Sequence, residues 1–151
     1  MSYDITWNCC GWDSWLWAAL KGAAPTHPTS IEASIQAYLD AGVPRGKLGM
    51  GLGLYSSGYS SPVSGPRQPM SNHYMWADYE GTWARLYRSG LLSDANYRFD
   101  SAAQTGYYSY ATPQTFLGNP VTMIITEDLQ SIAAKGYALG PRRHPMEKSP
   151  P

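Results

Sequence analysis

The sequence of 151 residues and 16.6 kDa is long enough for one domain. Its 11 Lys and Arg residues balance its 11 Asp and Glu residues, and this neutrality argues against an electrostatic nucleic-acid binder. No apolar run approaches the ~18 residues of a membrane span, and no basic-then-apolar secretion leader opens the sequence.

The first third of the sequence alternates strand and helix signals. Residues 1–7 are partly β-branched and aromatic, which predicts a strand that runs into a loop. Thr29 and Glu32 form a capping-box pattern, and apolar residues at helical spacing predict a helix over residues 30–41. Residues 47–55 are apolar at every second position with glycines between, which predicts a second strand.

The rest of the sequence carries more turn-forming residues. Ser, Gly and Pro are in excess over residues 56–73, which predicts a long loop. The further elements expected are a helix at 76–88, short strands at 96–99 and 107–110, a strand at 121–126, a helix at 127–139 and a disordered, Pro-rich tail at 141–151. The opening order of strand, helix and strand favours a parallel βαβ unit and an α/β fold.

Aromatic residues are the unusual part of the composition. The sequence has 6 Trp and 12 Tyr but only 2 Phe, so most rings carry a polar group. Such an excess is common where sugars or peptides bind, and it also occurs in domains rich in interfaces or loops. Trp7, Trp12 and Tyr59 are candidates for stacking on sugar faces, and Trp15 and Trp17 are candidates for the core.

Cysteine and histidine residues give no sign of a cofactor or metal site. Cys9 and Cys10 are adjacent, and a disulfide between neighbours is strained, so two free thiols are expected. His27, His73 and His144 are scattered and form no metal-ligand motif. We therefore expect neither a metal nor a cofactor.

Four segments match the landmarks of one family in the correct order. Residues 1–4 read Met-Ser-Tyr-Asp, and residues 42–55 read Gly-Val-Pro-Arg-Gly-Lys-Leu-Gly-Met-Gly-Leu-Gly-Leu-Tyr. Residues 96–110 contain Asn-Tyr-Arg-Phe-Asp and Tyr-Tyr-Ser-Tyr, and residues 125–135 read Ile-Thr-Glu-Asp-Leu-Gln-Ser-Ile-Ala-Ala-Lys. Together they resemble the sixth and seventh barrel strands, the insertion and the helix entering strand eight of glycoside hydrolase family 18, the chitinases.

This resemblance implies a partial TIM (β/α)8 barrel with a small α+β insertion. It covers about the C-terminal third of the barrel: the regions of strands 6 and 7 and the helix that enters strand 8. The implied division is a partial barrel over 1–59, the insertion over 60–120, a return to the barrel over 121–140 and an unrelated tail over 141–151.

The same resemblance implies a site for chitin or chitooligosaccharide. The family's reaction is substrate-assisted: a Glu protonates the glycosidic oxygen while the sugar's own acetamide attacks the anomeric carbon. The implied substrate-binding residues are Met1, Tyr3, Asp4 and Tyr55, and Trp7 joins them in the predicted site as a ring that could stack on a sugar. Tyr3 would meet the acetamide oxygen, Asp4 would lie near the acetamide nitrogen, and Met1 would line the sugar pocket.

One landmark of the family is absent. No run of the form Asp-x-x-Asp-x-Asp-x-Glu, which carries the catalytic acid, occurs in the sequence. Three functions therefore remain open: a chitinase-like hydrolase if whole, a catalytically incomplete fragment that binds chitooligosaccharide, and a hydrolase of small esters or lactones. Because two or three barrel strands cannot close a barrel, we also expect self-association through open edges.

Overall fold

The computed structural model describes residues 3–7, 11–26, 29–70, 75–78 and 81–139. Its helices are α1 (Ile31–Asp40), the short 3-10 helix η1 (Arg45–Lys47), α2 (Trp83–Arg88) and α3 (Leu129–Leu139). Its strands are β1 (Ser56–Tyr59), β2 (Met75–Asp78), β3 (Tyr97–Asp100), β4 (Thr105–Phe116) and β5 (Asn119–Thr126). The predictions for Met1, both cysteines, all three histidines and the tail concern residues outside the described ranges.

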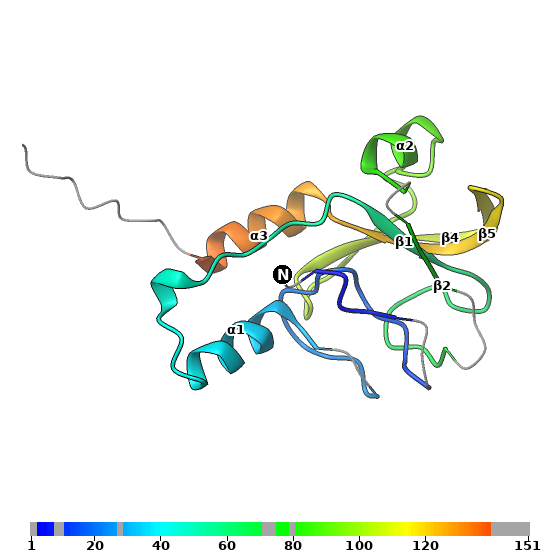
Figure 1. The fold of residues 1–151 in the computed structure, drawn as a ribbon. Coiled ribbons are helices and arrows are strands. Elements are labelled where there is room, and N and C mark those ends of the chain that lie inside the picture. The colour runs from blue at the N-terminus through cyan, green and yellow to red at the C-terminus, as the bar shows by residue number, and fades with distance from the viewer. Residues whose placement is uncertain (1–2, 8–10, 27–28, 71–74, 79–80, 140–151) are drawn as a thin grey trace, which may run out of the picture.

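The five strands form one sheet in the order β2-β1-β5-β4-β3. Every pairing within this sheet is antiparallel, and β4 and β5 form a long hairpin whose register shifts between Ser109 and Gln114. The fold is therefore mixed α/β, with α1 and α3 beside one end of the sheet and α2 over one of its faces (Figure 1).

β5 lies at the centre of the sheet, and a cluster of hydrophobic residues packs against each face of the sheet there. On one face, Met123 and Ile125 join Trp15, Trp17 and the buried segment that follows them. On the other face, Ile124 packs with a second cluster that includes Leu86 of α2. Successive side chains of a strand point to opposite faces, so a central strand covered on both sides is apolar throughout.

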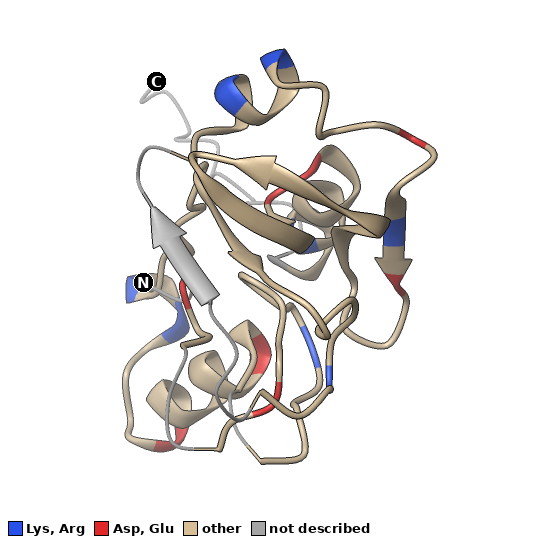
Figure 2. Cartoon of the chain, turned by 90° about the vertical axis from the view of Figure 1, so that its right-hand side faces the viewer, with Lys and Arg blue, Asp and Glu red and all other residues tan. Residues whose placement is uncertain are grey.

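Charged side chains leave the middle of the sheet free. Figure 2 shows Lys, Arg, Asp and Glu on the helices, the loops and β3, whereas β1, β4 and β5 carry none. Not all charged side chains are exposed. Lys135 of α3 and Glu127, which directly follows β5, form an ion pair in which both side chains are buried. Across the described ranges, no helix is both long and apolar enough to cross a membrane.

The long helices confirm the helical predictions, with one change in capping. α1 begins one residue later than expected, because Ser30 is the N-cap and its hydroxyl accepts a hydrogen bond from the backbone N–H of Ala33 at 3.3 Å. The predicted capping box at Thr29 was therefore wrong by one position. The predicted helix at 76–88 was too long: α2 begins after Thr82, whose hydroxyl caps it, and residues 75–78 form β2.

The strand predictions held in the second half of the chain and failed in the first. The strands at 96–99, 107–110 and 121–126 are confirmed as parts of β3, β4 and β5. Residues 3–7 and 47–55, predicted as parallel strands, are not strands of the described sheet. The strand lies instead at residues 56–59, predicted as loop, because β5 and β2 supply ladder partners on both sides there.

A loop over residues 64–70 secures the buried tryptophan segment. The backbone N–H of Ser14 donates to the carbonyl of Gln68 at 2.7 Å, and that of Arg67 donates to the carbonyl of Ser14 at 2.7 Å. The Arg67 guanidinium lies over the Trp15 ring, 4.8 Å from its centroid, and pairs with Asp100 of β3. These contacts hold residues 12–17 in place without any helix or strand in that segment.

Candidate functional site: an aromatic pocket near the N-terminal segment

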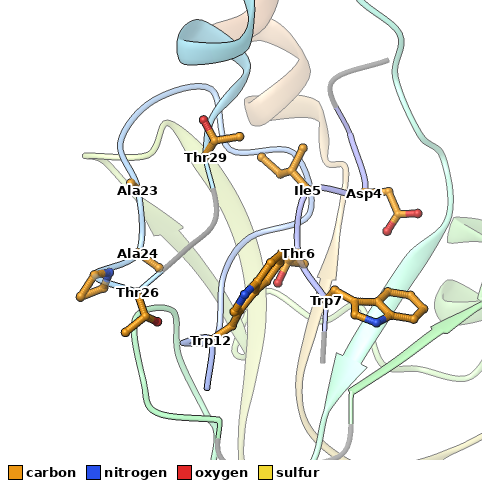
Figure 3. Close-up of a pocket in the computed structure, with 10 residues that line it drawn as sticks. Asp4, Ile5, Thr6, Trp7, Trp12, Ala23, Ala24, Thr26 and Thr29 are labelled. Carbon is orange, nitrogen blue, oxygen red and sulfur yellow. The ribbon is translucent and has the colours of Figure 1, made fainter. Parts of the chain in front are cut away.

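An open pocket of about 720 Å³ lies between the N-terminal segment and the loop that precedes α1. Figure 3 shows Asp4 and Trp7 on one side of this pocket, Ala24 and Thr26 on the other, and Trp12 between them. The Trp7 side chain is 57% exposed, so its ring faces solvent while remaining part of the wall. Exposed indoles beside a carboxylate can stack on an apolar face and hold a polar group at its edge.

Asp4 occupies an unusual backbone conformation. Its φ is +58°, in the left-handed region that Asp adopts more readily than most residues. Partial burial of its side chain raises the pKa of Asp4 above the usual value of 3.8. A residue other than glycine in the left-handed conformation carries backbone strain, which the surrounding structure must compensate. Such residues are often found at functional sites.

Hydrogen bonds from the core hold the two walls of the pocket. The hydroxyl groups of Thr6 and Tyr59 are 2.8 Å apart, and the Tyr59 oxygen also lies 3.2 Å from both the backbone nitrogen and the carbonyl oxygen of Trp15. On the opposite wall, the backbone N–H of Asp13 donates to the Thr26 hydroxyl at 2.8 Å. The Trp15 indole N–H donates to the carbonyl of Thr29 at 2.8 Å.

Tyr59 is therefore a core residue, which corrects its prediction as a sugar-stacking ring. It is fully buried in the cluster around Trp15 and Trp17, and burial raises the pKa of Tyr59 to about 12 despite its hydrogen bonds to Thr6 and Trp15. The sequence predicted a loop at residues 56–59, whereas these residues form β1, which is buried at every position.

Tyr3 and Tyr55 form a second aromatic group close to the pocket. Their rings meet edge to face with centroids 6.1 Å apart, and Tyr55 meets Trp17 in the same manner at 4.7 Å. Burial raises the pKa of Tyr55, and the negative charge of Asp4 raises it further. Tyr55 itself does not line the pocket.

Two glycines make room for the Tyr3 ring. A Cβ on Gly51 would lie 2.8 Å from Tyr3 Cε1, and one on Gly53 would lie 2.9 Å from Tyr3 Cδ2. Any larger residue at either position would displace the ring. The glycines that the sequence pattern placed inside a strand thus serve a close approach, as expected, but to a side chain of the same chain.

Of the five predicted site residues, Asp4 and Trp7 line the pocket, Tyr3 and Tyr55 pack together beside it, and Met1 falls outside the described residues. Sequence reasoning did not assign the opposite wall, residues 23–26, to a site. Its Pro-marked loop carries no motif, and it reaches the tryptophans through the packing of Ala24 and the bond from Asp13 to Thr26. In the described part of the chain, no three His, Cys, Asp or Glu side chains gather as metal ligands would.

The pocket and the sheet define a mixed α/β protein with an open aromatic site. No family model matches the sequence, and no curated protein matches it. Among solved structures, a chitinase from Rhizomucor miehei is similar to this chain, with a TM-score of 0.67 and 17% sequence identity. The likeness covers 92% of this chain and 44% of the chitinase chain. The fold is therefore chitinase-like, and the chain spans less than half the length of that chitinase.

Proposed function

We propose that this chain is the sugar-binding part of a chitinase-like glycoside hydrolase of family 18, and that the pocket at Asp4, Trp7 and Trp12 binds chitooligosaccharide. The single observation that carries the proposal is the position of Asp4 and an exposed Trp7 in one open pocket within a chitinase-like fold. The sequence supports it independently of the pocket, because the landmark at residues 1–4 includes Asp4 and the aromatic excess makes Trp7 a candidate for stacking on a sugar.

The chemistry of the pocket suits an N-acetylated sugar. The two indoles offer flat apolar faces for the apolar face of a pyranose ring. The Asp4 carboxylate accepts the acetamide N–H, and the nearby phenols of Tyr3 and Tyr55 are donors for the acetamide oxygen. A hydrogen bond from a neutral donor to a carboxylate is stronger than one between neutral groups.

The proposal includes the barrel and its division. Residues 1–59 and 121–140 would contribute part of a TIM (β/α)8 barrel, and residues 60–120 would form its α+β insertion. Hydrolysis by this chain is not part of the proposal, because the sequence has no Asp-x-x-Asp-x-Asp-x-Glu run to supply the acid. Binding without cleavage is thus the function that we assign to these residues.

The test is a calorimetric titration of the purified chain with N-acetylglucosamine hexamer, and with cellohexaose as the ligand that lacks the acetamide. We expect the acetylated sugar to bind and cellohexaose to bind more weakly. Replacing Trp7 by Ala should weaken binding of the acetylated sugar at least tenfold, about 1.4 kcal/mol.

The matched control is Trp83→Ala. Trp83 lies on α2, is 40% exposed and stacks on Tyr87 away from the pocket, so its loss should leave the affinity unchanged. Equal losses for the two tryptophan variants, or no binding of the acetylated sugar by the unaltered chain, would refute the proposed site. Product analysis after prolonged incubation separates binding from cleavage, and released shorter sugars would contradict the assignment of binding alone.

A further inference from the structure

The hydroxyl of Thr26 is the polar side-chain group that the wall at residues 23–26 presents to the pocket. Thr26 lines the pocket and is exposed. Figure 3 shows its oxygen on the side nearer Trp12, across the pocket from Asp4. The other residues of this wall have apolar side chains: Ala23, Ala24 and Pro25. A ligand that contacts this wall therefore meets one side-chain hydroxyl.

The hydrogen bond behind Thr26 leaves the hydroxyl proton available to a ligand. The Thr26 oxygen accepts the backbone N–H of Asp13 at 2.8 Å, and the hydroxyl donates to none of the described residues. A hydroxyl has one proton to donate besides its two lone pairs, whereas an ionised carboxylate such as Asp4 only accepts. The pocket thus has an acceptor on one side and a donor on the other.

A chain of β-1,4-linked N-acetylglucosamine has the complementary arrangement. Each linkage turns the next ring over, so the acetamide groups of two neighbouring sugars point to opposite sides of the chain. Every acetamide has an N–H that donates and a carbonyl oxygen that accepts. The pocket volume of about 720 Å³ lies in the range that holds drug-sized ligands, which leaves room for two sugar rings.

We propose that Thr26 is a specificity-determining residue that donates a hydrogen bond to the acetamide carbonyl of a second sugar, while Asp4 accepts the acetamide N–H of the first. This inference rests on the proposed function of the pocket and extends it. Trp12 lies between the two walls and offers its ring to the sugars that connect them. The unit that the pocket recognises is then a disaccharide with two acetamides, and not a single sugar.

Three substitutions at position 26 separate a bond to the sugar from the bond to Asp13. Thr26→Ser keeps both, Thr26→Asp accepts the Asp13 N–H but has no proton to donate at neutral pH, and Thr26→Val does neither. In calorimetric titrations with N-acetylglucosamine hexamer, we expect Thr26→Ser to bind like the unaltered chain. Thr26→Asp and Thr26→Val should bind about fivefold more weakly, the loss typical of one hydrogen bond. Neither variant should weaken the binding of cellohexaose, which has no acetamide.

Chain length gives a second measurement. N-acetylglucosamine has one acetamide and its β-1,4-linked dimer has two, so the dimer should bind the unaltered chain more tightly in an NMR titration. In Thr26→Val this advantage of the dimer over the monomer should shrink about fivefold. The matched control is Thr115→Val, because Thr115 is exposed on β4 and does not line the pocket, and it should preserve the advantage.

Two results would overturn the inference and leave the proposed function standing. If Thr26→Asp binds the hexamer as tightly as the unaltered chain, Thr26 acts only through its bond to Asp13. If Thr26→Val loses equal affinity for the hexamer and for cellohexaose, the hydroxyl contacts a group other than an acetamide. In both cases Trp7→Ala still weakens binding of the hexamer. If the unaltered chain does not bind the hexamer, both proposals are wrong. Melting temperatures check folding, and if Thr26→Val does not fold, the comparison of Thr26→Ser with Thr26→Asp decides.

Discussion

Asp4 combines a charge with a backbone conformation that few residues accept. Its φ of +58° suits Asp and Asn, whereas Ala there would add strain of roughly 1 kcal/mol. Asn has nearly the shape of Asp and tolerates the same conformation. Replacement by Asn therefore isolates the charge, and replacement by Ala mixes charge with strain.

We expect sugar binding by the unaltered chain to weaken in acid. Because burial raises the pKa of Asp4 above 3.8, the carboxylate that accepts the acetamide N–H is lost as the pH falls through a value above the usual one. Affinity should increase as the pH rises through this range and then level off. In Asp4→Asn, affinity should be lower and constant with pH, and titrations at a series of pH values measure both.

The stability of the same variant provides the control. A raised pKa in the folded state means that ionisation of Asp4 opposes folding above that pKa, and stability from this group is present only at lower pH. Asp4→Asn should therefore not lower the melting temperature at neutral pH. A pH dependence of binding that survives in Asp4→Asn would assign the titration to another group.

At the level of elements, the ion pair between Glu127 and Lys135 joins α3 to the end of β5. Both side chains are buried, and burial raises the pKa of Glu127 and lowers that of Lys135, although each charge partly offsets the effect on the other. Removing one partner from a buried pair leaves an uncompensated charge, which costs more than removing both.

We expect Lys135→Met to lower the free energy of unfolding at neutral pH by about 3–5 kcal/mol. The double variant Glu127→Leu/Lys135→Met should lose less, because no buried charge remains. The loss in the single variant should shrink in acid, where the isolated Glu127 takes up a proton. Urea unfolding at two pH values measures these differences.

Lys47→Met is the matched control, because Lys47 is exposed on η1. Its stability should change little. If the double variant were as unstable as Lys135→Met, the pair would be acting through packing of the lysine chain and not through charge.

The elements that the sequence predicts well are those with local signals. Helix α1 follows from apolar spacing and a serine or threonine cap, and β5 follows from its β-branched run. β1 could not be predicted, because Ser-Ser-Gly-Tyr has the composition of a loop and becomes a strand through partners 16 or more residues away. Residues 47–55 show the opposite case. They have the sequence pattern of a strand, but within the described residues they pair with no strand.

The candidate site also has parts that the sequence predicts and parts that it does not. The motif at residues 1–4 predicted Asp4, and the aromatic excess predicted Trp7. The wall at residues 23–26 reaches the pocket through bonds that no local pattern announces, such as the one from Asp13 to Thr26. Tyr59 was assigned to the wrong environment for the same reason, since its burial depends on packing by Trp15.

At the scale of the whole molecule, the sheet is covered unevenly. β5 has strand neighbours on both sides and hydrophobic clusters on both faces, whereas β2 and β3 lie at the two edges. Residues 49–54 have no backbone partner in the described part of the chain. Local opening requires the loss of side-chain packing and of backbone hydrogen bonds. The free energy of opening should therefore be high at β5 and low at residues 49–54.

The central position of β5 therefore has a consequence for the time that each backbone amide takes to exchange with heavy water. The amide protons of Ile124 and Ile125 should exchange slowest, because their release needs the hairpin and both hydrophobic clusters to separate together. Those of β3 should exchange sooner. Residues 49–54, which have no backbone partner in the described part of the chain, should exchange within seconds, so one deuterium experiment orders the regions of the molecule from the most protected to the most accessible.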